Sequence, residues 1–450
     1  MDEAQAVSNG RLPRRVFIVG SLTQFAVGLH SPFLNSYLID MGANYAEIGA
    51  FRAVGNVAPT VMQPAWGAAS DRIGHNKAFV VTGTLMGLFT VYLFVWAHTP
   101  LDMIILYAIQ SILFSIQIPT WLSLIGGLMG ERERGQELGR LGMATNIASL
   151  VATLWAGFMA GIPSLLPALR LALGGLGPIL LPPGNPIAES YYLPFYMTAV
   201  VGICSSLASL TIMEKRRPHT QKRTFPPVLK LLRRPGDFRR LCFVATFFSF
   251  GMSMAWPFFI VVQRTWLKNS LFEIALASAI MTISMVVLTV PFGKLSDRVG
   301  RRPLIILGRA LLFLVPALYA AVLFVRDTVL VYISNVIAGI ATAASMNATT
   351  AYIYDVAPEG ERGTHISVYN TFTGVIFLLG SLVAGILGEA LVPSLGLEIA
   401  VFAMLVLSAI LRVVASLMYF RLREPRVYVS TVRRELHNLV NRKRHDADSL

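Results

Sequence analysis

Long apolar stretches alternate with short polar segments along the whole chain. Each stretch holds about 20 residues, the length at which an α-helix crosses a hydrocarbon core of about 30 Å. Gly and Pro lie inside several stretches, and membrane helices tolerate them because neighbouring helices satisfy the freed backbone groups. The pattern predicts an all-α integral membrane protein with twelve transmembrane helices, at 15–38, 45–69, 77–97, 102–128, 141–162, 193–213, 241–263, 271–293, 303–325, 328–354, 365–387 and 396–420.

A short polar signature closes two of these apolar helices. Residues 67–74 are Gly-Ala-Ala-Ser-Asp-Arg-Ile-Gly, and residues 293–300 are Gly-Lys-Leu-Ser-Asp-Arg-Val-Gly. Glu47-Ile48 and Glu273-Ile274 match at the other ends of the same two helices, and Glu133-Arg134-Gly135 matches Glu361-Arg362-Gly363. The repeats predict two similar halves of six helices each.

Composition and charge agree with this class. Apolar residues make up 55% of the chain and charged residues 14%. With the N-terminus inside, seven of the 38 Lys and Arg lie outside the cytoplasmic segments: Arg52, Arg170, Arg264, Lys268, Arg309, Arg326 and Arg412. This asymmetry is the positive-inside rule, so we expect a multi-pass protein of the plasma membrane with both termini cytoplasmic, and we do not expect nucleic-acid binding. We interpret Cys204 and Cys242 as buried, inert thiols without a disulfide.

The polar segments divide the chain into five parts. We expect a cytoplasmic N-terminus at 1–14, a six-helix bundle at 15–213, a basic linker at 214–240, a second bundle at 241–420 and a basic tail at 421–450. Linker and tail interleave apolar and cationic residues, which favours short helices on the anionic inner leaflet, with a regulatory partner as the alternative. The apolar outer loop at 163–192 either packs over the outer mouth or lies in the interface.

The two octets resemble motif A of the major facilitator superfamily. The resemblance covers nearly the whole chain, with six plus six helices, a long basic central loop, and Glu-Arg-Gly after the fourth and tenth helices. It implies a secondary transporter whose motif residues act as gating elements rather than substrate ligands. These are Gly67, Asp71, Arg72, Gly74, Lys77, Arg134, Gly293, Asp297, Arg298, Gly300, Arg301 and Arg362.

Physical chemistry suggests a task for each kind of residue in the motif. Gly67 and Gly293 permit close helix approach, and Gly74 and Gly300 permit a tight turn. Asp71 and Asp297 need partners, either the adjacent Arg72 or Arg298 or the N-terminus of a helix in the other half. The resemblance places that N-terminus near Gly363, Thr364 and His365. The first copy has His75 and Asn76 where the second has Arg301 and Arg302.

Other motifs of proton-coupled drug antiporters are incomplete. Tyr107 stands where motif B of that family has an intramembrane Arg, and 150–161 lacks the Pro of motif C. We expect Arg52 to lie near the outer surface, by snorkelling or as an anion-attracting group, and Arg309 and Arg412 to reach the inner interface. His30 is interpreted either as a proton-coupling site or as a neutral group hydrogen-bonded to a neighbouring helix.

In the resembled family the central cavity is lined mainly by helices 1, 4, 7 and 10. Here those helices, with helices 5 and 11, offer amide, aromatic and thioether groups that suit a neutral or amphipathic solute. The named candidates are Gln24, His30, Asn35, Gln110, Gln117, Trp121, Asn146, Trp256, Asn335, Asn347, Tyr369 and Asn370.

The leading hypothesis is a monomeric secondary active transporter of a small organic solute, working by alternating access in the bilayer. Proton coupling is an option, and efflux of amphipathic compounds is favoured over uptake of a neutral or anionic metabolite. The alternative class is a non-transporting membrane sensor with the same fold. An enzyme is not expected, and neither is a metal or another cofactor, because no metal-ligand cluster, nucleophile elbow or phosphate loop occurs in the sequence.

Overall fold

The computed structural model describes residues 12–126, 128, 134–162, 165–181, 189–214, 236–358 and 362–424, and these form helices joined by turns. The linker at 215–235 and the tail from residue 425 lie outside the described residues. The helices of the first half are α2 (Arg14–His30), η1 (Ser31–Phe33), α3 (Leu34–Asp40), α4 (Tyr45–Ile73), α5 (Asn76–Leu93), η2 (Phe94–Trp96), α6 (Pro100–Ser115), α7 (Gln117–Gly126), α8 (Arg134–Ala160), α9 (Leu165–Ala172), η3 (Gly174–Leu176), α10 (Gly177–Leu180) and α11 (Glu189–Ser209). Those of the second half are α13 (Asp237–Met254), α14 (Trp256–Val261), η4 (Val262–Trp266), α15 (Leu271–Val299), α16 (Arg301–Leu311), α17 (Leu314–Val325), α18 (Val329–Val356), α19 (Arg362–Leu395), α20 (Leu397–Met418) and η5 (Tyr419–Arg421).

The predicted all-α membrane fold is confirmed. Eleven helical segments of the described chain are long and apolar enough to cross a membrane. The 29-residue helix α4 occupies the place of the second predicted span. Several spans are interrupted by a break, such as the turn η1 between α2 and α3. Such a span therefore consists of two or more labelled helices.

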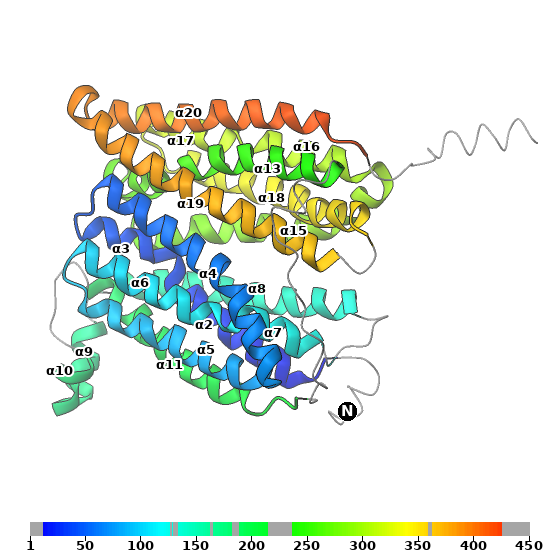
Figure 1. The fold of residues 1–450 in the computed structure, drawn as a ribbon. Helices are drawn as coiled ribbons and strands as arrows, with labels where there is room; N and C mark the ends of the chain where they lie inside the picture. Colours follow the sequence, from blue (N-terminus) through cyan, green and yellow to red (C-terminus); the bar gives the residue numbers. More distant parts are fainter. Residues whose placement is uncertain are drawn as a thin grey trace, which may run out of the picture.

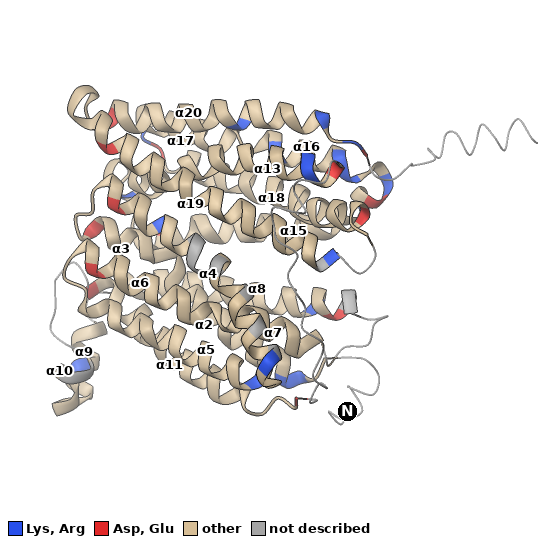
Figure 2. Ribbon diagram, viewed as in Figure 1, with Lys and Arg blue, Asp and Glu red and all other residues tan. Residues whose placement is uncertain are grey.

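The helices form two groups that lie one above the other in Figure 1. In the first group α2 packs on α8 and α11, and α6 packs on α4 and α5. In the second group α15 and α16 pack on α18, and α13 packs on α19 and α20. The groups meet where α4 contacts α19 and where α8 contacts α15. Lys, Arg, Asp and Glu residues concentrate along the ribbon at the two ends of the bundle, and few lie between them (Figure 2).

The repeated Glu47 and Glu273 are explained by helix capping. Asn44 and Glu47 form a reciprocal capping box at the start of α4, and Ser270 and Glu273 form the same box at the start of α15. Each box satisfies backbone N–H groups that have no partner within the helix. We call this end of the bundle the far end, and the end that carries Gly74 and Gly300 the motif end.

The prediction that both cysteines are buried is wrong for Cys204. The residue lies on α11 and is exposed, whereas Cys242 is buried, and both are free thiols. Val200, Ile203 and Leu207 are also exposed and lie within one turn of Cys204, so they form an outward apolar stripe with it.

The expectation that Arg412 reaches the inner interface is also wrong, whereas the same expectation for Arg309 stays a prediction. Arg412 is 1% exposed, and its guanidinium donates hydrogen bonds to the carbonyls of Leu312 (2.7 Å) and Met252 (2.9 Å). Both carbonyls lie beside helix breaks, one between α16 and α17 and the other between α13 and α14. Carbonyls freed by a break need another donor inside a membrane, and Arg412 supplies it for two helices.

Replacing Arg412 with Met is therefore expected to lower the stability of the folded protein. Two buried carbonyls would lose their hydrogen-bond donors. Because the variant no longer buries a charge, part of this cost is offset, and the free energy of unfolding is expected to fall by about 2 kcal/mol. The melting temperature of the purified protein in detergent measures the effect. Arg326→Met is the control, because Arg326 is 42% exposed and pairs with the exposed Glu398. An equal melting temperature for Arg412→Met and the wild type would contradict the assignment.

Candidate functional site

The two motif loops have the backbone that their glycines predict. Gly74 ends α4 with φ +74°, and Gly300 ends α15 with φ +112°, both in the region that favours glycine. The helix that follows each turn is capped by a carboxylate from the end of its own half. Glu214 accepts hydrogen bonds from the backbone N–H groups of Asn76 and Lys77, and Glu424 accepts them from Arg301 and Arg302. These two glutamates were missed by the sequence analysis, although each lies just past the last apolar helix of its half.

The charged motif residues form local ion pairs in the second copy. Asp297 near the end of α15 pairs with Arg301 at the start of α16 at 2.7 Å, across the turn at Gly300. Arg301 also contacts Asp355 of α18 at 3.3 Å. Arg72, Arg298 and Arg362 are exposed, whereas Lys77 is half-buried. The side chains of Asp71 and Arg134 lie outside the described residues.

At the far end the two halves touch through glycine. A Cβ placed on Gly49 of α4 would lie 2.7 Å from the carbonyl oxygen of Ser381, and one on Gly385 of α19 would lie 2.5 Å from that of Tyr45. On the other side of the interface, a Cβ on Gly157 of α8 would lie 2.6 Å from the Cβ of Ala275 on α15. Larger side chains would keep these helices apart, so the small residues allow the far end to close.

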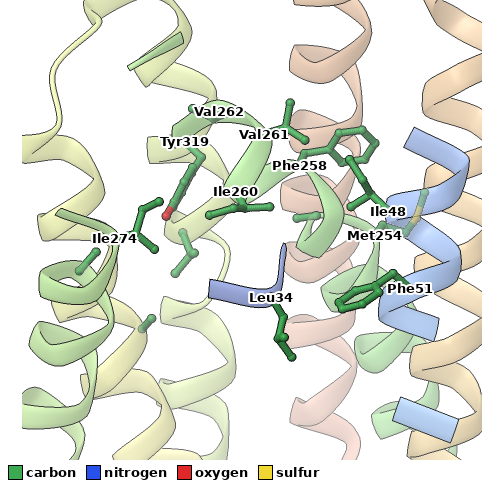
Figure 3. Packing of buried hydrophobic residues seen from close by; sticks show 14 of the residues in the cluster. Leu34, Ile48, Phe51, Met254, Phe258, Ile260, Val261, Val262, Ile274 and Tyr319 are labelled. Carbon is green, nitrogen blue, oxygen red and sulfur yellow. The ribbon is translucent and has the colours of Figure 1, made fainter. Parts of the chain in front are cut away.

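Apolar side chains fill the rest of this contact. Leu34, Ile48 and Phe51 from the first half belong to one buried cluster with Met254 and Phe258 from the second, and Figure 3 shows them close together. The rings of Tyr45 and Phe258 pack at an interplanar angle of 48°, with 5.6 Å between their centroids. The backbone N–H of Tyr45 also donates to Glu389 of α19.

An ion pair joins the halves at the same end. Arg264, in the π-helical segment η4, binds both carboxylate oxygens of Asp40 at 3.0 and 2.6 Å. Tyr191 of α11 donates to the same carboxylate, and Arg264 donates to the carbonyl of Asn269. The sequence marks Arg264 only as an outer cation and gives no signal for Asp40, because neither position is repeated in the other half. Two-point pairing of this kind is strong and directional.

At the motif end the same helix faces have no such contact. Eighteen residues separate Gly49 from Gly67, Gly157 from Gly139 and Ala275 from Gly293, which is five helical turns, so the members of each pair share a face. Among the described residues, a Cβ on Gly139 or Gly293 would meet nothing within 4 Å, and one on Gly67 would meet only Pro119 of its own half, at 3.9 Å. The predicted close approach at Gly67 and Gly293 is therefore absent in this conformation.

The predicted cavity residues fall into two groups. Most are buried or half-buried and include His30, Asn35, Gln110, Gln117, Trp121, Asn146, Trp256, Asn335 and Tyr369. Gln24, Asn347 and Asn370 are exposed. They lie in the middle of the first span (Gln24) and in the motif-end parts of α18 (Asn347) and α19 (Asn370).

Several of the buried candidates are held within one half. His30 Nδ1 lies 2.9 Å from the carbonyl oxygen of Ala26 and 3.5 Å from the hydroxyl of Thr198 on α11. Asn335 donates to the carbonyl of Val331, and Trp256 stacks on Phe377 at 4.9 Å. The contacts of His30 with Thr198 and of Trp256 with Phe377 join different helices, whereas that of Asn335 lies within α18.

Two of the intramembrane cations also interact with tyrosines. Arg309 lies over the Phe248 ring at 4.7 Å, and it is hydrogen-bonded to Tyr369. Arg52 is half-buried, and it interacts with Tyr107 of α6, the residue that stands at the place of the motif B arginine. Tyr369 is thereby engaged inside the second half.

Comparison with known proteins agrees with this architecture. The profile of the Major Facilitator Superfamily matches residues 16–265 and 241–445, which together span most of the chain. The chain belongs to the major facilitator superfamily. An uncharacterized MFS-type transporter of Methanocaldococcus jannaschii is 22% identical over 408 residues, 85% of this chain and 93% of that protein. A second one from the same organism is 26% identical over 196 residues, 42% of this chain, so the chain spans about half of its length (48%).

Solved structures of the superfamily show the same fold. A bacterial homolog to the human lysosomal transporter Spinster, in an inward-facing and occupied conformation, has a TM-score of 0.71 and 18% identity. The match covers 90% of this chain and 95% of that chain. At this level of identity the likeness supports the fold.

Removing the far-end ion pair is expected to open that end. Arg264→Gln leaves Asp40 without its two-point partner, and a loss of about 2 kcal/mol shifts a two-state equilibrium by roughly 30-fold. Spin labels at the exposed far-end residues His98 and Thr265, in a Cys204→Ser, Cys242→Ser background, would report a longer distance. Arg326→Gln is the control, because it breaks a far-end ion pair that lies within one half. A distance distribution that is the same in Arg264→Gln and the wild type would rule out a gating role for the pair.

Proposed function

We propose that this member of the superfamily is a secondary active transporter that moves a neutral organic solute by alternating access. The observation that best supports this proposal is a difference between the two ends of the interface. The helix faces touch at Gly49 and Gly157 at the far end, whereas no such contact is present among the described residues at Gly67 and Gly139 at the motif end. A pair of halves that meets at one end only is one of two states that a rocking carrier needs.

The chain adopts the state that is open at the motif end. Lys and Arg concentrate in the loops of that end, so the positive-inside rule supports assigning it to the cytoplasm of the cell. The exposed amides of Gln24, Asn347 and Asn370 support this assignment. Polar groups at membrane depth are stable where they line a water-filled path, so we place these side chains on the cytoplasmic entrance.

In the opposite state the motif glycines would make the contacts. Gly67, Gly139 and Gly293 lie on the faces already used at the far end, five turns away, and their small size would let the motif end close in the same manner. Motif A would therefore stabilise the state closed to the cytoplasm, with Asp71 and Asp297 as gating residues.

The solute is neutral because uncharged groups dominate the candidate path. The exposed candidates are amides, which donate and accept hydrogen bonds without requiring a charged partner. A buried ionic solute would need a compensating charge. His30 contacts its own half, so it gives no support to proton coupling through that residue. We propose export as the direction of transport. The proposal does not name the ion or solute gradient that drives it.

Two opposite substitutions test alternating access. Gly49→Val places a branched side chain where a Cβ already meets the Ser381 oxygen at 2.7 Å, so the far end is expected to stay open. Gly293→Val meets no described atom within 4 Å in the present state and is expected to prevent the motif end from closing. Both variants should lose transport in proteoliposomes, for opposite reasons.

Distances across each end separate the two cases. Spin labels at His98 and Thr265 report the far end, and labels at the exposed Leu138 and Leu295 report the motif end. Gly49→Val should lengthen only the far-end distance, whereas Gly293→Val should hold the long distance at the motif end. Identical distances in both variants, together with no flux of any solute in a broad panel, would favour the non-transporting sensor.

A further inference from the structure

The first membrane span is interrupted by a short turn between two helices. Helix α2 ends at His30, the turn η1 runs from Ser31 to Phe33, and α3 continues from Leu34. Pro32 has no N–H, so the carbonyl of Gly28, four residues earlier, loses its helical donor. Thr153 of α8 supplies a replacement, because its hydroxyl donates to that carbonyl at 3.0 Å. The break is thereby held open and tied to the fifth span.

A cavity of about 150 Å³ lies beside this break. It is lined by the α2–η1 junction and α8 from the first half and by α15 from the second. Five of the lining residues carry a hydroxyl group: Ser31, Ser149, Thr153, Ser278 and Thr282. The other described residues of the lining are apolar, and none of them carries a charge.

The hydroxyls have hydrogen-bonding capacity left for a ligand. Thr153 and Thr282 donate their protons to the carbonyls of Gly28 and Ser278, which leaves the oxygen of each hydroxyl free to accept. Within the described residues, the hydroxyls of Ser31, Ser149 and Ser278 make no hydrogen bond to protein. A ligand would therefore meet both donors and acceptors.

The cavity lies between the closed and the open parts of the interface. Gly157 and Ala275 pack together one to two turns farther along α8 and α15, so they seal the far-end side. Gly139 and Gly293 lie on the opposite side, where these helices have no close contact. A ligand would enter from the motif end, and it would touch both halves at once.

We infer that this cavity binds a small neutral polyol as the transported solute, held by the five hydroxyls of the α2–η1 junction, α8 and α15. The inference rests on the proposed function and names its substrate class. An ion would be buried without a counter-charge, and an apolar molecule would leave hydroxyls desolvated. The volume corresponds to about five water molecules, the size of a short polyol such as erythritol. Because both halves contribute, binding would favour the present state.

The test uses the purified full-length protein with three four-carbon probes: erythritol, butane-1,4-diol and erythronate. Erythritol is expected to raise the melting temperature saturably, whereas the diol lacks two hydroxyls and erythronate carries a charge, so both should be at least tenfold weaker. The double variant Ser149→Ala, Ser278→Ala should weaken erythritol binding roughly 30-fold, since each of the two lost hydrogen bonds contributes about 1 kcal/mol.

The matched control is Ser206→Ala, Ser209→Ala. These serines lie on α11 and donate to carbonyls within the first half, so erythritol binding should be unchanged. A linear rise in melting temperature, equal in both double variants, is the general osmolyte effect and would overturn the inference. No response to erythritol, or equal affinity for all three probes, would overturn it as well.

Failure of this inference is distinguishable from failure of the proposed function. If the label distances change as expected and another solute is transported, alternating access stands and the polyol assignment falls. If erythritol binds saturably but the distances never change and no flux occurs, the cavity is a binding site and the transport proposal falls.

Discussion

Close contact between small residues at one end of the interface is the constraint on which the rest of the structure depends. Gly49 and Gly385 on one side, and Gly157 and Ala275 on the other, bring four helices of the two halves within backbone distance. Among the described residues, the same faces of α4, α8 and α15 make no comparably close contact between the halves at the motif end.

The far-end contact is reinforced by polar groups that the two halves do not share. Asp40, Tyr191 and Arg264 form a partly buried network across the interface, and Glu389 binds the start of α4. By contrast, the devices that build each half are repeated. The capping boxes at Glu47 and Glu273, and the carboxylates Glu214 and Glu424 at the motif turns, occupy matching places. The contacts that shape each half are therefore repeated, whereas the polar contacts between the halves are not.

The second half also contains cations that serve its own packing. Arg412 satisfies carbonyls at two helix breaks, and Arg309 lies over Phe248 and interacts with Tyr369. Breaks in α13–α14 and α16–α17 give this half its shape, and each break frees backbone groups that lipid cannot satisfy. In the first span, Thr153 likewise donates a hydrogen bond to a carbonyl beside a helix break, but its donor is a neutral hydroxyl where Arg412 uses a charged guanidinium.

The sequence by itself determined the twelve spans, the repeat and the turns at Gly74 and Gly300. These depend on apolar length and on local backbone conformation, which are properties of neighbouring residues. Only the tertiary structure decided that the two halves touch at the far end, that Asp40 meets Arg264, that His30 contacts Thr198 and that Arg412 is buried. The faces of a membrane helix that meet lipid, water or another helix can carry the same residues. Gln24 and Gln110 are both amides in the middle of a span, and the neighbouring helices alone make the first exposed and the second buried.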